Sequence, residues 1–214
     1  VTPFVKQGDN VIAVYYGGGW YTSEVRRFGL PKVIYCLTVE REGGTDYFVS
    51  DEHCRVGGGF VTLSRFSTHN HLHREQHDYR IEADCLSTAF DDSQWKKAVP
   101  TEPLCTDYCS TDCPCDALIE QREVKQIGIR DTGVLYDCGE NTTGYPVLEI
   151  AAPRGEAVVV QLSEELSPDG DLDDAHIHGQ QFVVVSDGTK RLVQPEFNYF
   201  GFRYFRNKQS MRII

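Results

Sequence analysis

The chain has 214 residues, 40% of them hydrophobic, a formal net charge of -11 and eight cysteines. This length allows one large core or two smaller ones, because domains usually hold about 100 to 150 residues. The acidic balance would repel a phosphate backbone and no apolar run reaches the roughly 20 residues that cross a bilayer, so we expect neither nucleic acid nor a membrane as partner.

The start of the chain lacks the basic and apolar regions of a signal peptide. The chain also begins at Val1 rather than Met, which favours a piece of a longer protein. A chain of this size with many apolar strands does not depend on disulfides, and we expect most cysteines to be reduced thiols. These features favour the cytoplasm as location.

Strand signals dominate the sequence. The candidate segments are short, rich in β-branched and aromatic residues, and bounded by Gly, Asp, Asn or Pro. No long segment has the 3.6-residue apolar period of an amphipathic helix. The predicted fold is all-β, with two β-sandwich or jelly-roll domains in tandem. In chain order the predicted strands are 10–16, 32–40, 45–50, 135–136, 147–150, 157–162, 181–186 and 202–205.

Prolines and polar residues interrupt the strand pattern at residues 100–115, where Pro100, Pro103 and Pro114 lie. We therefore predict a first domain at residues 1–99, a linker at 100–115 and a second domain at 116–214.

Several motifs of the first half occur in a fixed order. Residues 1–14 and the segment 17–21, which reads GGGWY, are followed by 74–80 and by 90–95, which reads FDDSQW. This series resembles the galactose-binding-like N-terminal jelly roll of bacterial α-L-rhamnosidases. The first strands of that jelly roll have no counterpart here. An incomplete jelly roll would expose edge strands and apolar surface, so self-association is expected if those strands are missing.

Two motifs of the second half are more specific. Residues 137–145 read DCGENTTGY and residues 197–204 read FNYFGFRY, with apolar strands between them. The block resembles the concanavalin-like β-sandwich that precedes the catalytic domain in α-L-rhamnosidases.

The resemblance implies a parent enzyme that hydrolyses terminal α-L-rhamnosides with inversion, using two carboxylates on an α-helical barrel. Nothing in this chain matches that barrel, so we expect no catalytic residue here. Glu164 and Glu165 are neighbours on a predicted strand end and would point to opposite faces, which excludes them as a catalytic pair. The expected role is non-catalytic: bracing the barrel of the parent and binding rhamnose-containing glycan. The alternative is a stand-alone carbohydrate-binding module.

The candidate sugar contacts are Trp20, Tyr21, Glu75 and Asp78. Aromatic faces stack on sugar rings, carboxylates bond to hydroxyls, and the glycines before Trp20 let a ligand approach the backbone. A purely structural role for Trp20, packed across the sandwich edge, is the alternative.

Asp137, Asn141 and Arg203 are polar residues inside apolar motifs. We expect structural roles for them, because Asn and Asp mimic turns and Arg clamps carbonyls or carboxylates.

No cofactor is expected, but zinc and calcium are alternatives. Cys105, Cys109, Cys113 and Cys115 supply enough thiols for a zinc site, but we expect free thiols ahead of zinc or of local disulfides. His69, His71, His73 and His77 share one side of a strand, although the run looks solvated. The acidic loop 169–174 resembles a calcium loop, but its twelfth position counted from Asp169 is Gln180 rather than Glu, and the nearby His178 is no substitute, so an EF-hand is excluded.

Overall fold

The computed structural model describes residues 2–17, 32–65, 73–81, 84–103, 107, 109, 113–114, 117–175, 177 and 180–212, without the side chains of 64–65, 73 and 209–212. The all-β prediction is confirmed, because the described residues form strands and two single-turn 3-10 helices. The elements are η1 Thr2–Phe4, β1 Cys36–Arg41, β2 Gly44–Val49, β3 Arg55–Val56, β4 Val61–Arg65, β5 His73–Asp78, η2 Tyr79–Ile81, β6 Lys96–Lys97, β7 Lys125–Arg130, β8 Gly133–Gly144, β9 Leu148–Ile150, β10 Glu156–Ser163, β11 Gln181–Val185, β12 Arg191–Val193 and β13 Phe200–Arg212. Within these ranges no helix is long and apolar enough to span a membrane.

The chain forms two compact units that interleave along the sequence. The first unit takes Val1–Val14, Lys32–Gly58 and Asp84–Gln121. The second takes Tyr15–Pro31, Gly59–Ala83 and Arg122–Ile214. Residues 59–83, which the sequence prediction assigned to the first domain, therefore share a unit with the second half of the chain.

The first unit contains two short antiparallel pairs, β1 with β2 and β3 with β6. Its FDDSQW motif forms a turn in which the Trp95 amide donates to the Asp92 carbonyl. The Trp95 ring lies edge-on to Phe90 and directly over Gly57, where any added Cβ would lie 2.1 Å from the ring. Every buried hydrophobic residue of the described chain lies outside this unit. Its apolar side chains, such as Phe4 and Val99, are largely exposed.

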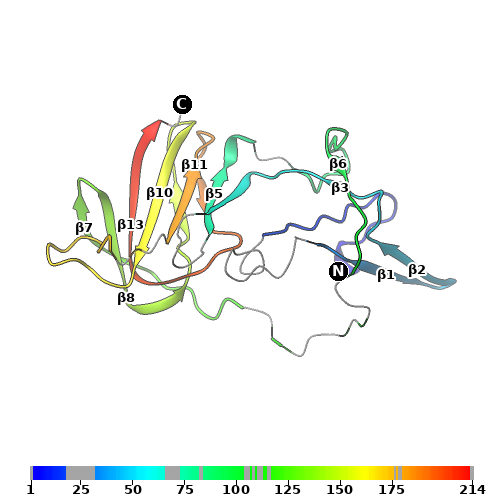
Figure 1. The fold of residues 1–214 in the computed structure, drawn as a ribbon, viewed down its shortest axis with the longest axis horizontal. Helices are drawn as coiled ribbons and strands as arrows, with labels where there is room; N and C mark the ends of the chain where they lie inside the picture. Colours follow the sequence, from blue (N-terminus) through cyan, green and yellow to red (C-terminus); the bar gives the residue numbers. More distant parts are fainter. Residues whose placement is uncertain are drawn as a thin grey trace. The chain divides into compact units, whose positions relative to one another are not determined.

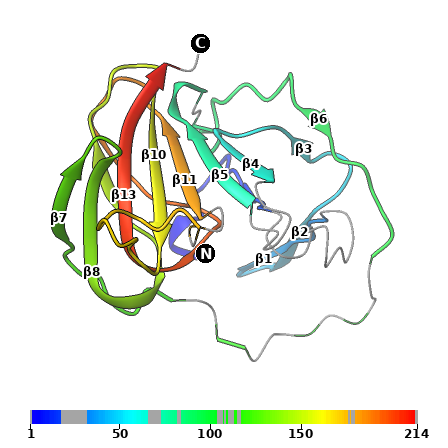
Figure 2. The same cartoon turned by 60° about the vertical axis from the view of Figure 1, so that its left-hand side comes forward.

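The second unit is built on one seven-stranded sheet in the order β4-β5-β11-β10-β13-β8-β7, which Figures 1 and 2 show as a row of neighbouring strands. All neighbours are antiparallel except β5 and β11. This parallel pair joins two segments about 105 residues apart and carries β4 and β5 into the sheet of the second half, with Phe182 opposite Glu75 and Val184 opposite His77.

The two faces of this sheet bury different cores. The larger core includes Phe182, Val160 and Phe205, with β9 and β12 contributing Ile150 and Val193. The smaller core, on the opposite face of β8 and β13, consists of Leu135, Leu172 and Ile177. Alternation along β10 explains the division, because Val158, Val160 and Leu162 belong to the larger core whereas Gln161 does not.

The prediction of a strand at residues 10–16 is wrong. This segment has no regular strand conformation. At its start, the Asn10 side chain accepts from the Lys6 amide and donates to the carbonyls of Lys6 and Gly8, so a local turn precedes the segment.

The connection between β7 and β8 requires glycine at position 133. Gly133 has a φ of +133°, and an added Cβ would lie 2.1 Å from the Asn207 carbonyl oxygen. We expect Gly133→Ala to lower the free energy of unfolding by about 3 kcal/mol, because backbone clash adds to the unfavourable φ.

Gly139→Ala is the matched control, since Gly139 has a φ of +88° and no atom within 4 Å of the added Cβ. It should cost only about 1 kcal/mol. Urea unfolding followed by circular dichroism measures both. Equal losses in the two variants would contradict the proposed clash.

Candidate functional site

The most unusual polar group of the second unit is a carboxylate inside the larger core. Glu75 on β5 and His77 are both fully buried. The His77 Nε2 lies 2.6 Å from the Glu75 Oε1, and its Nδ1 lies 3.3 Å from the Tyr79 hydroxyl. Because a carboxylate only accepts, Nε2 carries the proton toward Glu75. The three residues thus form a line from β5 into η2.

Glu75 also binds the backbone that leads into β13. Its Oε1 accepts from the Glu196 amide at 2.5 Å, and its Oε2 accepts from the amides of Phe197 and Asn198 at 3.1 Å each. With His77 this makes four donors, two on each oxygen, which use the four lone-pair sites of a carboxylate. Removal of a carboxylate from water is unfavourable by several kcal/mol, so such complete hydrogen bonding is needed to keep it buried. Glu75 therefore fixes the segment 196–198 against β5.

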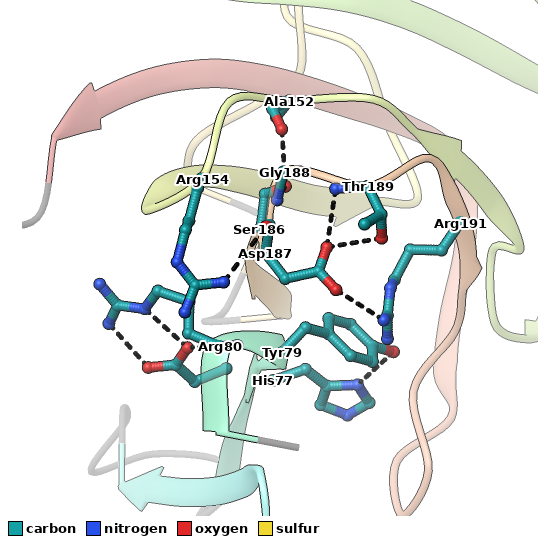
Figure 3. A network of polar contacts seen from close by, with 11 residues as sticks. His77, Tyr79, Arg80, Ala152, Arg154, Ser186, Asp187, Gly188, Thr189 and Arg191 are labelled. Carbon is teal, nitrogen blue, oxygen red and sulfur yellow. Dashed lines mark hydrogen bonds and ion pairs between the residues drawn. The ribbon is translucent and has the colours of Figure 1, made fainter. Parts of the chain in front are cut away.

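A second polar cluster surrounds the end of this line (Figure 3). The Arg191 guanidinium lies 4.0 Å from the centre of the Tyr79 ring and donates to Asp187 at 2.8 Å. The Thr189 hydroxyl and amide, followed by Arg191, hold the pKa of Asp187 below its usual range. Arg154 donates to the Asp187 carbonyl oxygen. The turn 186–189 after β11 is thereby tied to η2 and to the segment before β10.

Asp78, at the end of β5, forms two side-chain bonds with Arg80, at 2.9 and 2.7 Å. These bonds are the main reason why the pKa of Asp78 is lowered. Its side chain keeps 17% exposure whereas Glu75 keeps none. Of the two carboxylates predicted to contact sugar, Asp78 is therefore the more accessible, and Glu75 is engaged inside the fold. Trp20 and Tyr21 lie outside the described residues.

The two family-like motifs of the second half are paired strands. Residues 137–144 lie in β8 and residues 200–204 in β13, with Gly144 opposite Phe200 and Asp137 opposite Tyr204. Between these pairs the register shifts, so that residues 138–141 of β8 stand opposite Arg203. Such an irregularity bends a strand and increases its twist.

Asp137 and Arg203 hold this bend. The Arg203 guanidinium donates to both carboxylate oxygens of Asp137, at 2.9 and 3.1 Å. The Gly139 amide donates to the same carboxylate at 2.7 Å. Arg203 is the largest cause of the lowered pKa of Asp137, while partial burial opposes it. Asn141 is exposed within the bend.

On the opposite face of the sheet, Arg206 anchors the acidic loop. This arginine is 6% exposed, and its two terminal nitrogens lie 3.0 Å from Asp171 and 3.3 Å from Asp174. Burial alone would raise the pKa of Asp171, but donation by Thr132, the Leu172 amide and Arg206 lowers it overall.

Within the described residues, the cysteines and the other candidate metal ligands do not come together in a metal site. Cys36, Cys54, Cys85, Cys109 and Cys138 are free thiols. Burial, with the charge of Asp137, raises the pKa of Cys138 to about 11, so it is protonated at neutral pH. The described chain brings together no group of three or more Cys, His, Asp or Glu side chains suited to a metal ion. Cys105, Cys115, His69, His71 and His178 lie outside it, as does the His73 side chain, and zinc or calcium binding stays a prediction.

The fold and these interactions define a β-sandwich module in which charged residues fix loops and strand bends. Residues 1–123 match the family of the α-L-rhamnosidase N-terminal domain. Residues 127–211 match the bacterial α-L-rhamnosidase concanavalin-like domain. The chain therefore belongs to the bacterial α-L-rhamnosidase family.

Two longer proteins are similar to nearly the whole chain. An α-L-rhamnosidase of Formosa agariphila is 25% identical over 97% of this chain, and one of Streptomyces avermitilis is 27% identical over 95%. The chain spans only 24% and 21% of these relatives.

Two solved structures share the fold. The α-L-rhamnosidase of Dictyoglumus thermophilum aligns with a TM-score of 0.71 and 25% identity, covering 81% of this chain and 20% of that one. The α-L-rhamnosidase of Streptomyces avermitilis, solved with L-rhamnose, aligns with a TM-score of 0.65 and 22% identity over 90% of this chain and 20% of that one.

Substitution of Glu75 by Gln tests the clamp on residues 196–198. Gln keeps the size of Glu, but its amide nitrogen cannot accept from the backbone donors. We expect Glu75→Gln to lower the free energy of unfolding by about 3 kcal/mol. Hydrogen exchange of the Phe197 and Asn198 amides should also accelerate. The control is Glu149→Gln, an exposed residue paired with Lys190, which should change stability by less than about 0.5 kcal/mol. Unchanged exchange at 197 and 198 would argue against the clamp.

Substitution of Asp137 by Asn tests the ion pair at the strand bend. The carboxyl has a lowered pKa in the folded chain, so it stabilises the fold above its unfolded pKa, near 4, and loses this effect as pH falls through the folded value. Asp137→Asn should therefore lower the urea midpoint at pH 7, and the difference from the unmodified chain should shrink below about pH 4. A difference that is independent of pH from 7 to 2 would exclude an electrostatic origin.

Proposed function

We propose that this chain is the non-catalytic β-sandwich part of a larger glycoside hydrolase that hydrolyses terminal α-L-rhamnosides. The single observation that carries the proposal is the consecutive match of both halves to rhamnosidase domains, in relatives of which the chain spans about a quarter. About three quarters of each relative's length then corresponds to other parts, including the catalytic barrel that the resemblance implies.

The electrostatics of the described carboxylates support a non-catalytic role. An inverting glycosidase needs one carboxyl group with a raised pKa, which protonates the leaving oxygen, and a second that activates water. Every described carboxyl group whose pKa clearly departs from its usual value is shifted downward, as in Asp78, Asp137 and Asp187. Arginines or local hydroxyl and amide donors cause these shifts, which suits structural ion pairs.

The expected contribution of the chain is to brace the catalytic barrel of the parent protein and to bind rhamnose-containing glycan. Exposed apolar side chains on the second unit, such as Leu192 at 70% and Val147 at 45%, supply surface suited to contact with another domain. A stand-alone carbohydrate-binding module is less favoured, because the relatives that match nearly the whole chain are much longer proteins.

Hydrolysis of p-nitrophenyl α-L-rhamnoside tests the proposal. The 214-residue chain should release no nitrophenol above the buffer control, whereas the protein encoded by the complete reading frame should hydrolyse this substrate. Hydrolysis by the 214-residue chain itself would disprove its non-catalytic role. A complete reading frame whose product lacks rhamnosidase activity would disprove the assignment of the parent enzyme.

A further inference from the structure

One end of the seven-stranded sheet presents two exposed tyrosines. Tyr145 directly follows β8 and Tyr199 directly precedes β13, beyond the last pair of Gly144 with Phe200. Their side chains are 37% and 57% exposed. Extended by one residue, the register of that last pair sets Tyr145 opposite Tyr199. Opposite residues of antiparallel strands have their Cβ atoms about 5 Å apart, a spacing at which two rings can serve one ligand.

Extended by one residue beyond β8 and β13, strand alternation assigns both tyrosines to the face away from the larger core. Phe200 and Phe202 belong to that core and are 4% and 3% exposed. Tyr199 and Gly201, which alternate with them, therefore point to the other face. Thr143 is exposed and pairs with Gly201, so Tyr145 follows the same alternation.

Polar groups lie beside the tyrosines at Gly201. The Gln180 side-chain amide bonds both backbone groups of Gly201, donating to its carbonyl at 3.0 Å and accepting from its amide at 3.1 Å. Glu164 is exposed, and its Oε1 lies 3.3 Å from the point that a Cβ of residue 201 would occupy. Because Gly201 has no side chain, its backbone is uncovered beside the Glu164 carboxylate and the Gln180 amide, next to the two tyrosines.

We infer that Tyr145, Tyr199, Gly201, Glu164 and Gln180 form a binding site for a neutral sugar ring. Aromatic faces stack on the apolar face of a pyranose, and an exposed carboxylate accepts from its hydroxyl groups. Gly201 allows close approach of the ring to the sheet. The core of a protein–protein interface is depleted in charged residues, whereas here the Glu164 carboxylate lies at Gly201.

The inference rests on the proposed function for the identity of the sugar, a terminal rhamnose of a glycan. Its five residues differ from the predicted sugar contacts Trp20, Tyr21, Glu75 and Asp78. The site belongs to the second unit alone.

Saturation-transfer NMR with methyl α-L-rhamnoside at millimolar concentration tests the site. The unmodified chain should transfer saturation to the sugar, and Tyr199→Ala should weaken binding at least about tenfold. Glu164→Gln should weaken it less, because a neutral amide still bonds to hydroxyls. Tyr47→Ala is the matched control, since Tyr47 is 67% exposed in the first unit, and it should leave binding unchanged. Circular dichroism melting of each variant verifies that folding is retained.

Three outcomes would overturn the inference. The first is no saturation transfer to the sugar. The second is transfer that survives Tyr199→Ala but is lost in Trp20→Ala, which would place the sugar at the other predicted position. The third is a change of oligomeric state in light scattering on Tyr199→Ala without sugar binding, which would identify a protein contact. None of them bears on rhamnoside hydrolysis by the complete protein, which tests the proposed function separately.

Discussion

The second unit depends on the capture of three successive backbone amides by one buried carboxylate. Glu75 joins β5 to the segment 196–198, more than 120 residues later in the chain. Without these bonds β5 and the edge strand β4 would be held by the parallel ladder of β5 with β11 and by core packing alone. Because the carboxylate lies within the apolar core, its donors must all be in place, and the position of the chain before β13 is fixed as a result.

On the opposite face of the sheet from Glu75, the positively charged Arg206 holds β13 in place. Arg206 is buried among Gln161, Asp171 and Asp174, and it fastens the acidic loop over the smaller core. Glu75 and Arg206 therefore act on opposite sides of the same sheet, one through backbone donors and one through carboxylates. Asp171 and Asp174, two residues of the acidic loop, both pair with Arg206. β13 lies between β8 and β10, so its position affects most of the sheet.

The sequence predicts the class of this fold better than its connections. Strands such as β10 and β11 are dense in valine and could be located from composition and turn signals. The parallel pairing of β5 with β11 has no local signal, because it depends on which distant segment completes the sheet. The segment around Glu75 and His77 is rich in charged and polar residues and therefore looks solvated, yet both side chains are buried. Local pattern cannot show that three amides 120 residues away compensate for the buried charge.

For Asp137 and Arg203, the sequence identified the residues but did not show that they contact each other. Both could be singled out as polar residues within apolar motifs, but only the register of β8 and β13 shows that they bind each other. The last pair of these strands, Gly144 with Phe200, also sets the chain positions from which Tyr145 and Tyr199 extend. Glu75 positions the chain where it enters β13, and the ion pair of Asp137 with Arg203 maintains the bend of β8. Together these interactions determine where the exposed tyrosines lie. A motif typical of the family can in this way be structural in most of its residues and still present a surface at its end.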